Sequence, residues 1–273
     1  MITADERPPF AAAATVTHRA DPSGNQDAHR VLTLERDECC GVIVADGVGS
    51  WERSGEAANV AVDAARDVLA SRGPGALRPA FRAAQEAVGS LGDSDADFVG
   101  GTTLLIATVS KPGTVAIGHV GNGAVLHASL VPGSHVAGVP GRSVQWTNLV
   151  LPDVVVEHGR CVLSNVLTTR PTRIVEPQLQ RHSSCQGSAF VVATDGVWSL
   201  DEASTAATDD GRHWLPVPFP LWRTVVAAEW ALRARAAGAS GLEVPTDPLP
   251  ALLDGLAADR LLHDDTTVGL VIP

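Results

Sequence analysis

Polar and apolar residues alternate along two segments near the N-terminus, residues 13–18 and 30–35. A period of two predicts strands with one buried face, and we expect these two strands to form a hairpin. Other segments are apolar almost throughout, which predicts buried strands. They are GVIVAD (41–46), GGTTLLIATVS (100–110), TVAIGHVG (114–121), GAVLHASL (123–130), AFVVATD (189–195) and TTVGLVIP (266–273). Short Gly-containing turns join the three strands between 100 and 130, so we expect a meander there.

A period near 3.6 predicts four helices, at residues 54–72, 76–91, 220–238 and 247–262. In the first of them, Ser54 is expected to cap the N-terminus. The helices come in pairs and the strands in antiparallel-looking groups. This order favours an α+β fold over alternating strand–helix units.

Two stretches show little periodicity. Residues 131–188 hold several Pro and Gly and only short apolar runs, so we expect a flap-like, loop-rich region with a short strand near 160–164. Residues 1–12 are expected to be a loose N-terminal segment. No linker divides the chain, and we predict a single domain over residues 1–273.

The composition excludes several classes of protein. Hydrophobic residues make up 45% of the chain and charged residues 19%, which suffices for a packed core and argues against disorder. A net charge of -11 argues against nucleic-acid binding, because phosphates attract a basic surface. The sequence contains no run of about 18 apolar residues, so we predict no membrane span. The cysteines lack metal-site spacing, and MITADERPPF lacks a secretion signal, so we expect a cytoplasmic protein with reduced thiols.

The dipeptide Asp-Gly ends two of the predicted buried strands, in VIVADGVGS (42–50) and VVATDGVWS (191–199). Either pair alone is typical of a turn, since Gly accepts positive φ and Asp bonds to nearby backbone. Two more acids stand at strand boundaries: Asp27 in GNQDAH, and Asp264 before the last strand. Four acids in such positions are poorly explained as unrelated turns.

Antiparallel neighbours place the end of one strand beside the start of the next, so Asp46, Asp195 and Asp264 can gather at one edge. Carboxylates buried together repel one another unless a cation compensates their charge. Ligation by oxygen alone favours Mg or Mn over zinc. Gly47 lets the backbone approach such an ion and offer a carbonyl oxygen. The sequence therefore predicts a metal site.

The order of motifs resembles that of the metal-dependent serine/threonine protein phosphatases, the PPM or type 2C family. The resemblance runs from about residue 15 to the C-terminus and is closest to bacterial members. Six short motifs in the correct order make it specific. They are NQDAH, VADGVGS, GGTTLLIATV, AIGHVGNGAVL, VVATDGVWS and HDDTTVGLVI.

This resemblance implies a four-layer αββα sandwich of two antiparallel sheets flanked by helices. It also implies two Mn²⁺ or Mg²⁺ ions. Asp46 would bridge them, while Asp195 and Asp264 complete one ion's shell. The Gly47 carbonyl would bind the other ion, and Asp27 would hold that ion's waters.

The chain departs from the family pattern at several positions. Pro22 stands where the family commonly has a phosphate-binding Arg, and Arg19 is the nearby candidate for that role. Gln26 replaces a common Glu, and Asn122 replaces an Asp that helps hold a third metal in bacterial members. We therefore expect no strong third site. Val48 stands where some members have a catalytic His, so a metal-bound water would protonate the leaving group.

The resemblance implies a phosphoprotein phosphatase that hydrolyses phosphoserine and phosphothreonine with a water activated by two metal ions. Its partners would be a phosphorylated protein and a cognate serine/threonine kinase, with no nucleic acid or membrane. Two alternatives stay open. One is a pseudophosphatase, a binding or regulatory module with weak or no turnover. The other is a phosphatase for a small phosphorylated metabolite.

Overall fold

The computed structural model describes much of the chain in separate ranges. These are residues 10–16, 24–34, 39–49, 51–92, 100–110, 113–132, 142–157, 160–170, 175–183, 188–197, 205–207, 214–216, 249, 253–254 and 264–273.

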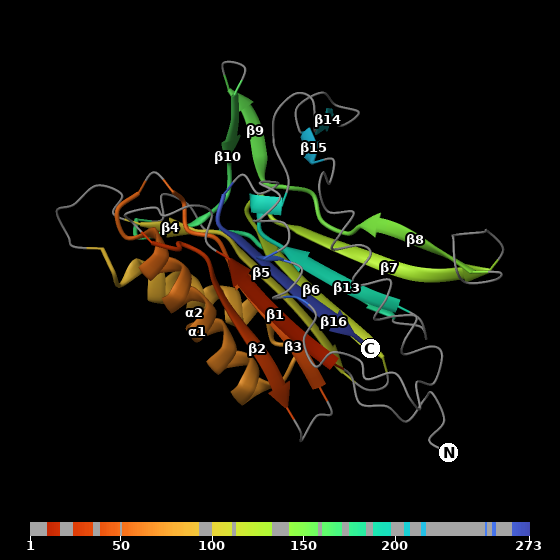
Figure 1. The fold of residues 1–273 in the computed structure, drawn as a ribbon. Coiled ribbons are helices and arrows are strands. Elements are labelled where there is room, and N and C mark those ends of the chain that lie inside the picture. The colour runs from red at the N-terminus through yellow and green to blue at the C-terminus, as the bar shows by residue number, and fades with distance from the viewer. Residues whose placement is uncertain are drawn as a thin grey trace.

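Two five-stranded antiparallel sheets pack face to face at the centre of the protein (Figure 1). The first sheet has the order β1-β16-β13-β7-β8 and the second the order β12-β6-β5-β3-β2. The strands of the first sheet are β1 (Phe10–Val16), β16 (Thr266–Ile272), β13 (Ser188–Ala193), β7 (Ala124–Pro132) and β8 (Arg142–Asn148). Those of the second are β12 (Gln178–Ser183), β6 (Thr114–Val120), β5 (Leu104–Ser110), β3 (Cys39–Ala45) and β2 (Ala28–Leu34).

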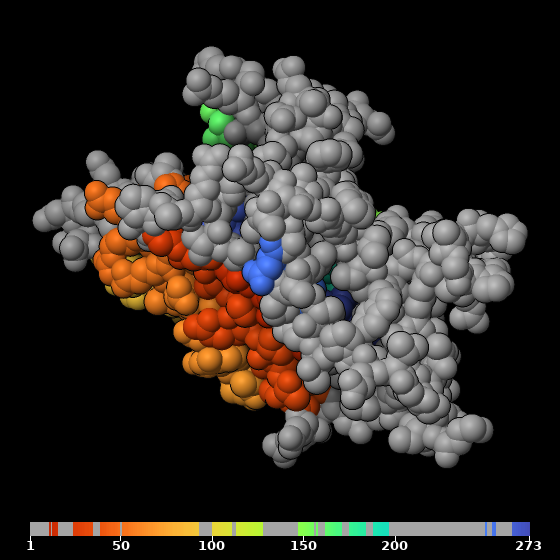
Figure 2. All heavy atoms as spheres, in the orientation of Figure 1, coloured from red at the N-terminus to blue at the C-terminus, as the bar shows by residue number. Residues whose placement is uncertain are grey.

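Two helices, α1 (Ser54–Arg72) and α2 (Leu77–Gly89), cover the outer face of the second sheet. Their Ala-rich buried faces let them lie close to the sheet. In the space-filling view, the helices and β2 form one continuous face (Figure 2). The shorter elements are β4 (Gly101–Thr102), β9 (Val154–Glu157), β10 (Arg160–Leu163), β11 (Leu167–Thr168), the 3-10 helix η3 (Asp195–Val197), β14 (Thr205–Ala207) and β15 (Trp214–Pro216).

The strand β3 shows why the central strands are apolar throughout. Ile43 and Ala45 pack against the helices, whereas Val42 and Val44 pack between the two sheets. Both faces of the strand are therefore covered, and every residue of β3 is buried. An antiparallel sheet normally leaves one face polar, but the helix layer removes that option here.

Two predicted strand pairings are wrong. The predicted hairpin of residues 13–18 and 30–35 does not form, because β1 pairs with β16 in the first sheet and β2 with β3 in the second. The predicted meander holds for β5 and β6, but β7 joins the other sheet and pairs with β13 and β8. Period-two alternation identifies the buried face of a strand, but it does not indicate which strand pairs with it.

Residues 131–188 are more regular than predicted. They contain β8, β9, β10, β11 and β12, and the short strand expected near 160–164 is β10. β8 and β12 are edge strands of the two sheets. The described residues of β12 are only partly buried or exposed, which explains the weak apolar signal in its sequence.

The helix predicted at 54–72 is confirmed in its bounds, but its expected cap is wrong. Arg53 occupies the N-cap position, without a side-chain cap hydrogen bond. Ser54 instead donates its hydroxyl to the carbonyl of Val48 at 2.7 Å. That bond fastens the start of α1 to the loop that follows Asp46.

The α+β class and the two antiparallel sheets are confirmed. Most of the helices predicted at 220–238 and 247–262 lies outside the described residues, so the fourth layer stays a prediction. Residues 10–12, predicted to be loose, belong to β1. In the part of the chain that the structure describes, no helix is long and apolar enough to cross a membrane.

Candidate metal centre

Acidic residues from both sheets meet at one end of the sandwich. Asp27 directly precedes β2 and Asp46 directly follows β3, and the neighbouring residues Ala28 and Ala45 are paired. From the first sheet, Asp195 begins η3 just after β13. Figure 1 shows η3 and the start of β16 at the same end, from which β9 and β10 project. The predicted gathering of these strand ends is therefore observed.

The carboxylates are close enough to change one another's proton affinity. Burial, followed by the charges of Asp195 and Asp27, raises the pKa of Asp46 well above its ordinary value. Burial also raises the pKa of Asp27 to about 7, although hydrogen bonds from Thr267 and Thr194 oppose that rise. Burial raises the pKa of Asp195 to about 6, with a contribution from Asp264. Each of these carboxyls is thus harder to ionise than an ordinary aspartate, and nearby positive charge would favour its charged form.

Several buried oxygen atoms at this end have no hydrogen-bond donor. They are Asp27 Oδ1, Asp195 Oδ1, Gln26 Oε1 and Asn122 Oδ1. Asp46 and Asp195 are partly accessible as whole residues, but Asp195 Oδ1 is itself buried. A buried acceptor without a donor is costly, and hard cations are bound by oxygen atoms of this kind. The donor set therefore fits Mg²⁺ or Mn²⁺.

The acids that the structure describes interact with one another, but they are not arranged as metal ligands. Among the described residues, no group of three or more His, Cys, Asp or Glu side chains is arranged to hold a metal ion. In Asp27 and in Asp195, one carboxylate oxygen accepts a hydrogen bond from a neighbouring side chain. Thr194 Oγ1 donates to Asp27 Oδ2 at 2.9 Å, and Asn122 Nδ2 donates to Asp195 Oδ2 at 2.5 Å. The second oxygen of each of these carboxylates remains for a cation.

Asp264 and Asp265, at the start of β16, differ in burial and in their hydrogen bonds. Asp264 is exposed and accepts a 2.8 Å hydrogen bond from the Asp265 amide. Asp265 is buried, and its Oδ2 accepts the Gln26 amide at 2.8 Å. The second acid therefore ties the Asp27 segment to the first sheet. Sequence reasoning missed this role, which the paired acids in HDDTT signalled.

Gly47 is required by close packing. A Cβ at this position would lie 2.7 Å from the Ser54 carbonyl carbon and 2.9 Å from the Gln26 carbonyl oxygen. The Gly47 amide also donates to that Gln26 oxygen at 3.2 Å. The loop after Asp46 is thus wedged between α1 and the segment that carries Asp27. The predicted role of its carbonyl in binding an ion is separate from this packing.

Arg19, the predicted phosphate-binding residue, and Pro22, which stands at the family's usual Arg position, lie outside the described residues. Arg19 as the phosphate-binding residue therefore stays a prediction. Gln26, Val48 and Asn122, where the chain departs from the resembled pattern, are all described and all lie at this end.

Comparison with protein families decides the relationship. A model of the family described as "Protein phosphatase 2C" matches residues 16–234. The chain belongs to the protein phosphatase 2C family. Its matched region includes Asp27, Asp46 and Asp195, whereas Asp264 lies beyond it. No curated protein sequence matches the chain.

Solved structures show that this protein phosphatase 2C family member shares its fold with bacterial phosphatases. MsPP, a PPM Ser-Thr phosphatase from Mycobacterium smegmatis solved with cacodylate, is 21% identical, with 96% of this chain and 97% of that chain covered and a TM-score of 0.62. The catalytic domain of PstP, solved with two manganese ions, is 17% identical, with 97% of each chain covered and a TM-score of 0.61. RsbX, solved with magnesium, is 16% identical, with 97% and 94% covered and a TM-score of 0.55.

Proposed function

We propose that this protein phosphatase 2C family member is a Mn²⁺- or Mg²⁺-dependent phosphatase that hydrolyses phosphoserine and phosphothreonine in proteins. One observation carries the proposal. Three interacting carboxylates, from Asp27, Asp46 and Asp195, lie beside buried oxygen atoms that have no hydrogen-bond donor. Such a cluster costs stability unless cations bind it.

Asp46 would help to hold both ions, because its carboxylate interacts with those of Asp27 and Asp195. Asp195 and Asp264 would hold one ion. The Gly47 carbonyl and Asp27 would serve the second. When bound, a metal pair supplies a nucleophilic water at neutral pH and offsets the charge of the phosphate.

The chain's own residues prepare the site for this chemistry. The Thr103 amide and the Thr102 hydroxyl donate to the Asp46 carbonyl at 2.8 and 2.9 Å, so the backbone of Asp46 has little freedom. Because the pKa of Asp46 is raised, its proton would leave when a cation binds, which makes metal affinity increase with pH. The substrate would come from a serine/threonine kinase reaction, the chemistry that forms phosphoserine and phosphothreonine.

A pseudophosphatase is the second candidate. The hydrogen bond from Asn122 to Asp195, together with the absence of a converged acid group among the described residues, favours it. In this case the same site would bind metal weakly or not at all, and the protein would act by binding a partner.

Hydrolysis of para-nitrophenyl phosphate and of a phosphothreonine peptide tests the proposal. Purified protein is assayed with Mn²⁺, with Mg²⁺ and with EDTA, beside Asp195→Asn and the surface control Asp67→Asn. We expect metal-dependent turnover that Asp195→Asn abolishes and Asp67→Asn leaves unchanged. A folded protein without turnover at any metal concentration would overturn the proposal and favour the pseudophosphatase.

A further inference from the structure

Thr103 lies in the middle of the acidic end of the second sheet. It is buried and sits between β4 and β5. Val44 pairs with Leu105 on one side of β5, and Val120 pairs with Leu104 on the other. One position beyond the Leu104–Val120 pair and two beyond the Leu105–Val44 pair, these ladders place Thr103 between Gly121 and Asp46.

The hydroxyl of Thr103 fixes the backbone of Asp46. The Asp46 amide donates to Thr103 Oγ1 at 3.0 Å, and the Thr103 amide donates to the Asp46 carbonyl at 2.8 Å. Both backbone polar groups of Asp46 are therefore bound by one residue. A side-chain oxygen replaces the usual carbonyl acceptor of the ladder, so this geometry depends on a hydroxyl.

The methyl group of Thr103 packs on the opposite neighbour. Gly121 has a φ of 108°, which L side chains rarely adopt, and a Cβ there would lie 2.5 Å from Thr103 Cγ2. Asp153 clamps Gly121 from the outside: the Gly121 amide donates to Asp153 Oδ2 at 3.0 Å, and the Asp153 amide donates to the Gly121 carbonyl at 2.6 Å. The turn after β6 is thus held between Thr103 and Asp153.

The turn after β6 also carries Asn122, which forms a hydrogen bond with Asp195 of the first sheet. Asn122 directly follows Gly121, and its Nδ2 donates to Asp195 Oδ2. One contact path therefore runs from Asp46 through Thr103 and Gly121 to Asn122 and Asp195. It crosses from the second sheet to the first.

We propose that Thr103 is a positioning residue that sets the separation of Asp46 and Asp195, its hydroxyl through the Asp46 backbone and its methyl through Gly121 and Asn122. This inference rests on the proposed function, because the separation matters only if the two acids share metal ions. Thr102 also contacts the Asp46 backbone, since its hydroxyl donates to the Asp46 and Thr103 carbonyls, but the side chain that packs on Gly121 is that of Thr103.

Manganese binding, measured by isothermal titration calorimetry, provides a readout that does not depend on turnover. Thr103→Val removes the hydroxyl and keeps the shape of the side chain. Thr103→Ser keeps the hydroxyl and removes the methyl. Thr108→Val is the matched control, because Thr108 lies on the same β5, is buried, and donates its hydroxyl to the Pro74 carbonyl away from the site.

We expect Thr103→Val to weaken manganese binding by about 10-fold or more, as is typical when a group that orients a metal ligand is lost. Thr103→Ser should recover most of the affinity, and Thr108→Val should bind manganese like wild type despite a comparable loss of thermal stability. Unchanged manganese affinity in Thr103→Val, or an equal loss of affinity in Thr108→Val, would overturn this inference but not the proposed function. Failure of the wild-type protein to bind manganese would overturn the proposed function as well.

A double-mutant comparison isolates the role of the methyl group, and it remains informative if Thr103→Val does not fold. If the methyl acts through Asn122, Thr103→Ser should weaken manganese binding less in an Asn122→Ala background than in wild type. Fully additive losses in the double variant would contradict the path through Asn122.

Discussion

At the scale of single residues, the buried carboxylates of the site repel one another, which lowers the stability of the metal-free protein. Asp27, Asp46 and Asp195 all have raised pKa values, chiefly because burial disfavours their charged forms. Their neighbours lessen this cost without removing it, since the hydroxyl of Thr194 and the amide of Asn122 each serve only one oxygen of a carboxylate. Stability and metal binding should therefore respond in opposite directions when an acid is neutralised.

Asp46→Asn should abolish turnover and raise the melting temperature of the metal-free protein. The amide keeps the size of the side chain, carries no charge and removes the repulsion from Asp27 and Asp195. Each kcal/mol gained raises the melting temperature by about 2–4 °C in a domain of this size. Thermal unfolding in EDTA and the para-nitrophenyl phosphate assay together check both effects. Retained turnover would contradict the assignment of Asp46 as the shared ligand.

The metal-free protein should lose stability as the pH rises from about 4 to about 7. The pKa of Asp27 rises from 3.8 to about 7 on folding, so the folded state holds a proton that the unfolded chain releases in this range. The melting temperature in EDTA should fall over this window, and the fall should be smaller in Asp27→Asn. A wild-type curve that runs parallel to that of Asp27→Asn would show that Asp27 does not contribute.

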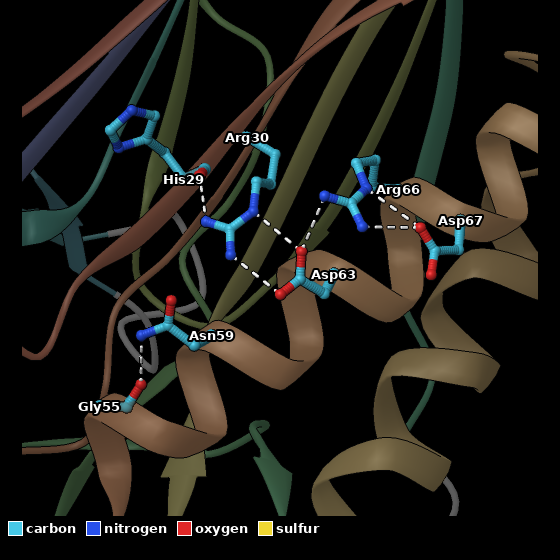
Figure 3. A network of polar contacts seen from close by, with 7 residues as sticks. All are labelled: His29, Arg30, Gly55, Asn59, Asp63, Arg66 and Asp67. Atoms are coloured by element: carbon cyan, nitrogen blue, oxygen red, sulfur yellow. Dashed lines mark hydrogen bonds and ion pairs between the residues drawn. The ribbon is translucent and has the colours of Figure 1, made fainter.

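At the scale of elements, hydrogen-bonded ion pairs attach α1 to the edge strand β2. Arg30 on β2 donates from both Nε and Nη2 to the carboxylate of Asp63 on α1, each at 2.9 Å, and Arg66 forms an ion pair with Asp63 at 3.1 Å (Figure 3). Arg30 also donates to the carbonyl of His29 at 2.7 Å. The helix is thus fastened close to the segment that begins with Asp27.

Asp63→Asn should reduce the free energy of unfolding by about 1 kcal/mol or less, because the pair is partly exposed, with side chains 30% and 41% accessible. Glu86→Gln is the comparison, since Glu86 pairs with Arg82 on α2 with both side chains largely exposed. We expect no measurable change there. Urea unfolding of both variants checks the difference, and equal losses would mean that the Arg30 contact adds nothing.

At the scale of the whole molecule, the site belongs to neither sheet alone. Asp27 and Asp46 come from the second sheet, whereas Asp195 and Asp264 come from the first. The apolar layer between the sheets, which includes Val42, fixes how the two sets of acids face each other. The packing of the sheets is therefore part of the site's geometry.

Phe190→Leu should weaken manganese binding, while Phe81→Leu should not. Phe190 is buried between the sheets on β13, and Phe81 is buried between α2 and the second sheet. Each substitution should cost about 1–2 kcal/mol of stability through lost apolar contact. Calorimetric titration beside urea unfolding separates the two effects. Equal manganese affinities in the two variants would contradict a role for sheet packing in the site.

The amino-acid sequence by itself determined where the first two helices and most strands of the two sheets lie, although not β8 and β12, and that Asp27, Asp46 and Asp195 stand at strand boundaries. Apolar periodicity and helix propensity are local, so they identify β3, β13 and α1 without any partner. The resemblance of the ordered motifs then predicted the protein phosphatase 2C family, which the family comparison confirmed.

Only the tertiary structure decided which strands are neighbours. β1 and β7 entered the first sheet instead of pairing beside β2 and β6, because strand pairing depends on packing over both faces of the sandwich rather than on local pattern. The same holds for Thr103, Thr194 and Asp265, whose hydrogen bonds reach residues far away in the chain. Thr103 and Thr194 have the sequence context of ordinary residues beside a strand, and the role of all three arises only when two sheets bring distant backbone groups together.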